Sequence, residues 1–347
     1  MKRFVALGSL LLAAVITGCS SPGGSSSYGM TPMTTTLPVA ELLEPSTMRI
    51  TGAYAVPFFG NSDVTNLIVG PDRRIWFAEF EGNAIGAMTT AGVISQYPTG
   101  SGSQPLGLAV GPKPKPKNVW TGGYGGTMTE STQTGSLTNF PIAGANIGDI
   151  VLGPDKNMWF ADYGNKKLGR ITTTGVVTEF PLPTGGSPDS LVVGPDHNFW
   201  IIDGGRNKIV KMNRTGAVLA SYGKGFSANE YAINMVYAPD GKFYVSEYAP
   251  QFGVPDKIAR VTIKGKIKEI GTLPPLSYPN RLAVGKDGNV YFVMSNLQAI
   301  GKIDLAKSKV TYHFLPFTYT QGMQAIVNGP DNRLYVAGSN AIYAISY

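Results

Sequence analysis

Acidic and amide side chains recur at two positions of a repeated pair of short apolar runs. One set lies where the first run of a pair begins, and the other lies where the second run ends. Carboxylate and amide oxygens are the ligands that hard cations such as Ca²⁺ and Mg²⁺ take in proteins. The candidates for a binding face are Asn66, Asp149, Asp189, Asn234, Asn280 and Arg281 in the first set and Glu79, Asp162, Asp203 and Glu247 in the second.

Two interpretations of these residues stay open. In the first, a divalent cation (Ca²⁺ or Mg²⁺) is the cofactor and takes its ligands from Asp149, Asp189, Asn234 and Asn280. In the second, each carboxylate accepts hydrogen bonds from the backbone or the neighbouring amides of its own repeat, which is the usual arrangement for a buried carboxylate. The second interpretation requires no ligand, and it assigns no catalytic residue.

The elements that carry these residues come from an internal repeat. A Gly-Pro-Asp turn precedes a short run containing Trp or Tyr, and seven copies follow one another. The turn varies to Gly-Pro-Lys in the second copy, Ala-Pro-Asp in the fifth and Gly-Lys-Asp in the sixth. The spacings between equivalent turn positions are 41, 42, 41, 44, 47 and 44 residues, counted from Asp72 through Lys113, Asp155, Asp196, Asp240 and Asp287 to Asp331. Runs of about five residues between turns predict strands. A period in the forties with four strands per unit predicts an all-β, seven-bladed β-propeller over residues 48–347.

The ends of the chain predict how the ring closes. The seventh copy stops at Tyr347, one strand short of the others, and 48–54 supplies a matching strand. We expect this N-terminal strand to complete the last blade, which leaves no open sheet edge. One aromatic residue in the second strand of each copy predicts packing between blades: Trp76, Trp120, Trp159, Trp200, Tyr244, Tyr291 and Tyr335.

The first 19 residues predict export. Lys2 and Arg3 precede an apolar stretch over residues 4–16, which is too short for a comfortable membrane span. The stretch ends in Ile-Thr-Gly-Cys at Cys19, the only cysteine, and resembles the lipobox of bacterial lipoproteins. That resemblance implies cleavage before Cys19, lipidation of Cys19 and anchoring to the cell envelope, at the outer membrane in a Gram-negative host. An ordinary secretory signal is the alternative.

Composition limits the partners. Residues 20–47 are rich in Ser, Gly, Thr and Pro and predict a flexible tether. Without Lys2 and Arg3 the chain keeps 27 basic and 22 acidic residues, a net charge of +5. The basic residues are scattered, so no nucleic-acid partner is expected. We expect a monomer that meets the membrane through its lipid anchor alone.

The repeat also resembles a known family. The pattern GPDxNxWFxE…NKIGRITTTGxxTEFPxP, clearest in 153–183 and 70–98, is similar to that of the virginiamycin B lyase family. The resemblance implies a metal-assisted elimination that opens a cyclic depsipeptide, with catalytic histidines in the last two blades and an acidic residue in the last. Here the corresponding positions hold Asn280, Gln324 and Gly338-Ser339, while the two histidines, His197 and His313, lie elsewhere.

These observations lead to three functional hypotheses. The first is a non-catalytic, lipid-anchored propeller that binds an envelope ligand or protein, since amides cannot act as a general base. Around blade five the longest loops carry Tyr248 and Phe252, which suit a binding surface. The alternative is a diverged metal-dependent lyase or lactonase-type hydrolase acting on a cyclic ester or depsipeptide. The third is a structural role in envelope assembly.

Overall fold

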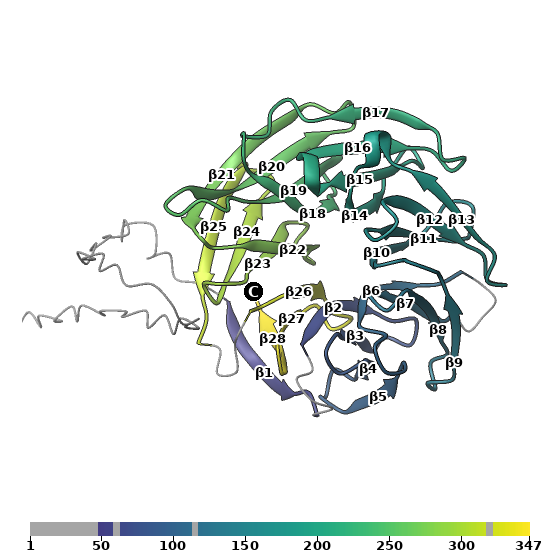
Figure 1. Cartoon of the computed structure of the whole chain (residues 1–347). Helices are drawn as coiled ribbons and strands as arrows, with labels where there is room; N and C mark the ends of the chain where they lie inside the picture. The colour runs from purple at the N-terminus through teal and green to yellow at the C-terminus, as the bar shows by residue number, and fades with distance from the viewer. Residues whose placement is uncertain (1–47, 58–62, 113–116, 317–321) are drawn as a thin grey trace, which may run out of the picture. The chain divides into compact units, whose positions relative to one another are not determined.

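The computed structural model describes residues 48–57, 63–112, 117–316 and 322–347. These residues form seven four-stranded sheets arranged as blades in a ring, with the first strand of each blade innermost (Figure 1). The predicted all-β, seven-bladed propeller is confirmed. The leader with Cys19 and the tether over 20–47 lie outside the described residues. Within the described part of the chain, no helix is long and apolar enough to cross a bilayer.

The first four blades follow the order of the chain, each as an antiparallel meander. Their strands are β2 (Val64–Val69), β3 (Ile75–Glu79), β4 (Ala84–Met88) and β5 (Ile94–Pro98); β6 (Pro105–Val110), β7 (Val119–Gly123), β8 (Thr127–Ser131) and β9 (Leu137–Pro141); β10 (Ile147–Leu152), β11 (Met158–Asp162), β12 (Lys167–Ile171) and β13 (Val177–Pro181); and β14 (Pro188–Val193), β15 (Phe199–Asp203), β16 (Lys208–Met212) and β17 (Val218–Tyr222). Two short 3₁₀ turns accompany blade four, η2 (Pro183–Gly185) and η3 (Gly204–Arg206).

The remaining three blades complete the ring. Their strands are β18 (Tyr231–Tyr237), β19 (Lys242–Tyr248), β20 (Pro255–Thr262) and β21 (Ile267–Pro275); β22 (Pro279–Val284), β23 (Val290–Met294), β24 (Ala299–Asp304) and β25 (Lys309–Phe314); and β26 (Ala325–Asn328), β27 (Leu334–Gly338), β28 (Ala341–Ser346) and β1 (Arg49–Ala55). Blade seven therefore takes three strands from the C-terminus and one from the N-terminus.

The N-terminal strand closes the ring as predicted. β1 pairs antiparallel with β28, from Arg49 opposite Ser346 to Ala55 opposite Ala341. The innermost strands then contact one another in sequence round the axis, and β26 of the last blade contacts β2 of the first. Because strands from both ends of the chain form one sheet, the first and last blades contact each other as any other pair of neighbouring blades does.

The repeated aromatic residues are buried between blades, as expected. Trp159 is fully buried and packs with Leu191 and Phe199 of the next blade. Its ring also stacks on Phe180 of its own outer strand, with the ring centroids 5.5 Å apart. The indole Nε1 of Trp159 donates to Oδ1 of Asp155 at 2.8 Å. The turn aspartate is thus a hydrogen-bond acceptor for the buried aromatic residue as well as a turn former.

The same bond recurs in five further blades and is missing from blade two. The other pairs are Trp76–Asp72, Trp200–Asp196, Tyr244–Asp240, Tyr291–Asp287 and Tyr335–Asp331. In blade two Lys113 takes the place of the aspartate in the sequence. The buried Nε1 of Trp120 has no hydrogen-bond partner among the described residues.

The glycine of each Gly-Pro-Asp turn makes room for this aromatic ring. A Cβ at Gly153 would lie 2.3 Å from Cδ1 of Trp159, closer than any side chain allows. Gly70 stands in the same relation to Trp76, at 2.2 Å. The motif is therefore fixed by the buried ring as much as by the turn.

We expect Asp155→Ala to lower the free energy of unfolding by about 1–3 kcal/mol, because the buried indole of Trp159 loses its acceptor. Urea unfolding followed by tryptophan fluorescence measures the change. The exposed Thr173→Ala, two residues beyond β12, is the control and should shift stability by less than about 0.5 kcal/mol. Equal effects of the two substitutions would contradict a role for the bond.

Candidate functional site

One end of the ring gathers most of the candidate residues. It is the end at which the first strand of each blade begins and the second strand ends, and we call it the mouth. At its centre, Arg281 Nη1 of blade six lies 2.6 Å from Asp149 Oδ1 of blade three. Ser190 Oγ donates to Asp149 Oδ2 at 2.8 Å, and Asn234 Nδ2 donates to Ser190 Oγ at 3.3 Å. The Leu282 amide donates to Asn234 Oδ1 at 3.4 Å.

This chain of contacts joins blades three, four, five and six, and we call it the floor of the mouth. It brings together three of the predicted site residues, Asp149, Asn234 and Arg281. The guanidinium supplies the positive charge that the first interpretation assigned to a metal ion. A cation using Asp149 and Asn234 would have to compete with Arg281 for them. Asn280 lies beside Arg281, half-buried at the start of β22.

Aromatic residues line the rim of the mouth at one repeated position. The residue that follows or ends the second strand is Phe80, Tyr124, Tyr163 and Tyr248 in blades one, two, three and five. Phe80 and Tyr124 meet edge to face with ring centroids 5.4 Å apart. Tyr248 meets Tyr278 at 4.8 Å. Of these rings, the sequence analysis predicted Tyr248 alone. The others could have been recognised, because all four aromatic residues occupy the same position of the repeat.

Blade four breaks this pattern and places a carboxylate at the rim. Its equivalent residue is Gly204, and a Cβ there would lie 1.8 Å from Oδ2 of Asp189. The glycine thus leaves the space that Asp189 occupies. Asp189 is exposed at the rim. Even so, partial desolvation by the surrounding protein, followed by the charges of Asp203 and Asp149, raises its pKa to about 7. It can hold or release a proton near neutral pH.

The tyrosines and Asp189 are close enough to affect one another. Burial first, then Asp189 and Tyr163, raise the pKa of Tyr124. Burial first, then Tyr248 and Asp189, raise the pKa of Tyr278. The raised pKa values keep the phenols of Tyr124 and Tyr278 neutral at physiological pH beside Asp189.

Asp256 holds the long blade-five loop in place. This fully buried carboxylate accepts hydrogen bonds from the Ala249 amide at 2.8 Å, from Ser277 Oγ at 2.8 Å and from the Tyr278 amide at 2.7 Å. It links the β19–β20 loop, which carries Phe252 at 86% exposure, to the loop before β22. Nothing in the sequence pairs Asp256 with partners about twenty residues away, so it was not among the predicted residues.

Three of the carboxylates that end second strands are bound within their own blades. Asp162 accepts from the Asn146 amide at 3.1 Å and from the Asn165 amide at 3.0 Å. Asp203 accepts from the Ser187 amide at 2.8 Å. These carboxylates shape the loops between strands.

Glu79 is the third of these carboxylates. Both its oxygens accept from Gln96 Nε2 at 2.8 Å. Burial raises the pKa of Glu79 to about 7 in spite of this bond.

Glu247 differs from the other three. It is fully buried, and neither carboxylate oxygen has a hydrogen-bond partner among the described residues. Burial, followed by the charges of Glu269 and Glu230, raises its pKa to about 9. It lies on the blade-five side of the mouth, apart from the floor.

The remaining predicted residues lie as follows. Gln324 precedes β26, and its Nε2 donates to Oδ1 of Asp63 in the neighbouring blade at 2.7 Å. Gly338 ends β27 opposite Ala341, with Ser339 after it. Asn66 is buried on β2 beside a register shift.

The two histidines lie in the elements that the sequence predicted, a turn between a first and a second strand and an outer strand. His197 is exposed in the turn between β14 and β15, and His313 lies on the outer strand β25. Burial and Lys302 lower the pKa of His313.

The fold and the mouth define a seven-bladed β-propeller with a polar floor and an aromatic rim. The chain belongs to the virginiamycin B lyase family, whose model matches residues 47–251 and 186–346. No curated protein sequence matches it significantly.

Solved structures share the propeller fold. A streptogramin B lyase structure superposes with a TM-score of 0.76 at 19% identity, covering 86% of this chain and 97% of the other. Virginiamycin B lyase from Staphylococcus aureus gives 0.76 at 18%, covering 86% and 99%. The WD40 β-propeller domain of Doa1 gives 0.68 at 12%, covering 87% and 97%. At these identities the superpositions establish the fold and leave the activity open.

We expect Glu79→Gln to stabilise the protein in a pH-dependent way. The folded-state pKa of about 7 lies above the ordinary value of 4.5, so the folded protein holds a proton that the unfolded chain releases. Wild-type stability should therefore fall as pH rises from about 4.5 to 7, and the neutral amide of the variant removes that loss. The variant should gain up to about 3 kcal/mol relative to wild type at pH 8 and little at pH 4.5.

Urea unfolding at both pH values measures this difference. The exposed neighbour Glu81→Gln is the matched control and should show no such pH-dependent gain. A gain for Glu79→Gln that is equal at both pH values would contradict the assignment.

Proposed function

We propose that the chain is a non-catalytic propeller of the cell envelope, which binds a ligand or protein at its mouth. The observation that supports this most directly is Gln324. The resemblance to the lyases places a catalytic histidine there, whereas the Gln324 amide bonds to Asp63 at 2.7 Å. An amide cannot accept a proton near neutral pH, and elimination requires a general base. Asn280 and Gly338-Ser339 stand at the other family positions.

The rim suggests the class of ligand. Tyrosine and phenylalanine faces bind planar, apolar or cationic groups. Asp189 adds one negative charge that a basic group would stabilise, because a nearby cation favours the ionised carboxylate. We infer a ligand that carries both aromatic and basic groups, such as a segment of peptide. Tyr248 and Phe252 of blade five would meet a larger partner.

A second candidate function rests on Asp189 as well. It is accessible, and its pKa of about 7 suits a general base. A diverged lyase or lactonase-type hydrolase of cyclic esters or depsipeptides would use it, with a divalent cation held near Asp149, Asn234 and Asn280. Arg281 already forms an ion pair with Asp149, and this weighs against a cation at that carboxylate.

One pair of assays separates the two candidates. A virginiamycin B lyase has been solved with quinupristin, so that compound is the turnover probe, with Mg²⁺ present and ring opening followed by chromatography. We expect no ring opening by the purified full chain. Turnover that disappears in Asp189→Asn would overturn the proposal in favour of an enzyme.

Binding is measured with a short peptide rich in tryptophan and lysine, using titration calorimetry. Tyr248→Ala and Asp189→Asn should each weaken binding by on the order of tenfold, equivalent to about 1.4 kcal/mol. Phe314→Ala, which removes an exposed ring from the outer strand β25, is the control and should leave binding unchanged. Equal binding by all variants would exclude the rim as the binding surface.

The envelope location is proposed from the leader. The lipobox-like segment that ends at Cys19 supports lipidation, and the tether over 20–47 would hold the propeller away from the membrane. Cys19→Ala should abolish incorporation of radiolabelled palmitate and release the protein from the membrane fraction. Ser20→Ala is the control. Labelling that persists in Cys19→Ala would contradict the anchor.

A further inference from the structure

We propose that blade five contains a binding site for a hard divalent cation of the Ca²⁺ class, formed by Glu230, Glu247 and Glu269. One carboxylate oxygen from each residue lies within 4.8 Å of the others. Glu230 comes from the loop before β18, Glu247 from the end of β19 and Glu269 from the outer strand β21. This site is separate from the floor, where the sequence had suggested a metal.

Unpartnered oxygens point to a missing ligand. Glu247 is 0% exposed and Glu230 is 4% exposed. Both oxygens of Glu247 and Oε2 of Glu230 lack a hydrogen-bond partner in the described part of the chain. Buried carboxylate oxygens are normally paired, hydrogen-bonded or metal-bound, because burial without compensation is costly. Three such atoms in one cluster provide ligand positions that no described donor occupies.

Comparison between blades shows that the missing donors are particular to blade five. Strand pairing makes Glu247, Lys257 and Glu269 equivalent to Asp162, Lys167 and Glu179 of blade three. In blade three, amide donors from Asn165 and Asn146 satisfy the strand-end carboxylate. In blade one, Gln96 stands at the outer position and donates to Glu79.

Blade five has an acid at the outer position instead and a third acid, Glu230, from a loop. Lys257 Nζ contacts Glu230 Oε1 at 2.8 Å and Glu269 Oε2 at 3.0 Å. When all the groups are ionised, three carboxylates and one ammonium leave two negative charges. That excess equals the charge of one divalent cation.

The chemistry of the cluster suits Ca²⁺ or a similar ion. Ca²⁺ takes six to eight oxygen ligands in flexible geometry, from carboxylates, carbonyls and water. Ser227 adds a further oxygen, since its Oγ donates to Glu269 Oε2 at 3.0 Å and also contacts Lys257 Nζ. A bound cation would use the unpartnered oxygens of Glu247 and Oε2 of Glu230, and it would compete with the Lys257 ammonium for Glu230 Oε1 and Glu269 Oε2.

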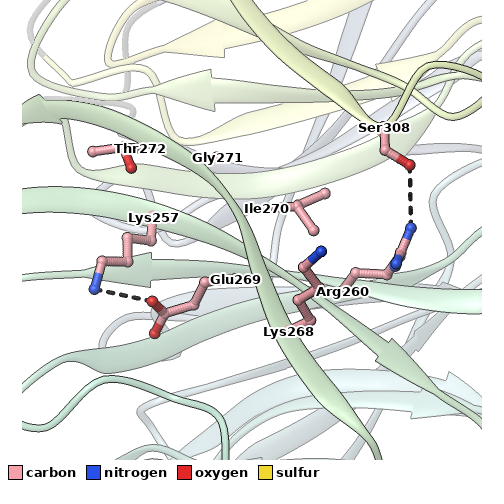
Figure 2. Close-up of a pocket in the computed structure, with 8 residues that line it drawn as sticks. All are labelled: Lys257, Arg260, Lys268, Glu269, Ile270, Gly271, Thr272 and Ser308. Carbon is pink, nitrogen blue, oxygen red and sulfur yellow. Dashed lines mark hydrogen bonds and ion pairs between the residues drawn. The ribbon is translucent and has the colours of Figure 1, made fainter.

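The cluster has a route to solvent. Lys257 and Glu269 have side chains that are 20% and 23% exposed. Both line a groove of about 510 Å³ that β20 and β21 of blade five form with Ser308 of blade six. Figure 2 shows the two side chains together at one end of this groove, with Arg260 and Ser308 at the other. Glu230 and Glu247 are more deeply buried. The partly exposed side chains of Lys257 and Glu269 mark the route by which an ion would reach the buried carboxylates.

The test uses the purified full chain, first treated with EDTA, and Ca²⁺, Mg²⁺ and Mn²⁺ as separate probes. Calorimetry should detect one equivalent of Ca²⁺. At a hundredfold excess over Kd, Ca²⁺ should raise Tm by about 4–8 °C. Glu247→Gln keeps the size of the side chain and removes its charge, so the variant should fold and lose affinity by tenfold or more. Asp304→Asn, a half-buried acid of blade six paired with Lys307, is the matched control and should bind as wild type does.

Lys257→Met distinguishes an ion site from a lysine-centred salt bridge. Without metal the variant should be destabilised, since the carboxylates lose their counter-charge. Ca²⁺ should restore its Tm and bind on the order of tenfold more tightly than to wild type, because no ammonium competes. If neither wild type nor Lys257→Met responds to any of the three ions at millimolar concentration, the proposal is wrong. Binding that Glu247→Gln leaves unchanged would overturn it as well.

Discussion

The pairing of β1 with β28 is the contact on which the whole ring depends. A propeller blade buries both of its faces against neighbours, so the ring is stable only when the first and last blades are joined. Here that join is a strand ladder between segments almost 300 residues apart, with Thr51 Oγ1 also donating to the Ala344 carbonyl at 3.1 Å. The mouth exists because this closure holds blades three and six in position for Asp149 to meet Arg281.

The repeat separates scaffold positions from variable ones. In most blades the turn glycine, the turn aspartate and the buried aromatic ring form one unit, in which the glycine leaves room for the ring and the aspartate accepts its hydrogen bond. Positions at the end of the second strand and on the outer strand are not constrained in this way. Blade one places Glu79 with Gln96 there, and blade five places Glu247 with Glu269. Divergence at these few positions turns equivalent blades into parts of a rim or an acidic cluster, whereas the floor comes from side chains on the first strands.

Much of the architecture could be predicted because its signals are local and repeated. The period, the turns and the spare N-terminal strand led directly to seven blades and their closure. The contribution of the turn aspartate to the buried ring was not predicted, although it follows from a fixed separation of four residues. The candidate site was predicted less completely. Asp256 and the Asp189–Gly204 fit involve partners on different strands, whose distances no sequence spacing records.

By itself, then, the sequence determined the fold and the end of the ring at which the polar residues collect. Alternating strands and a regular period suffice for this, because each blade repeats the same local geometry. Tertiary structure alone decided which charges meet. Arg281 neutralises Asp149 from 132 residues away, whereas Glu247 is buried beside two more acids with no donor among the described residues. Electrostatic energies depend on distances and burial between blades, and those exist only once the ring has closed.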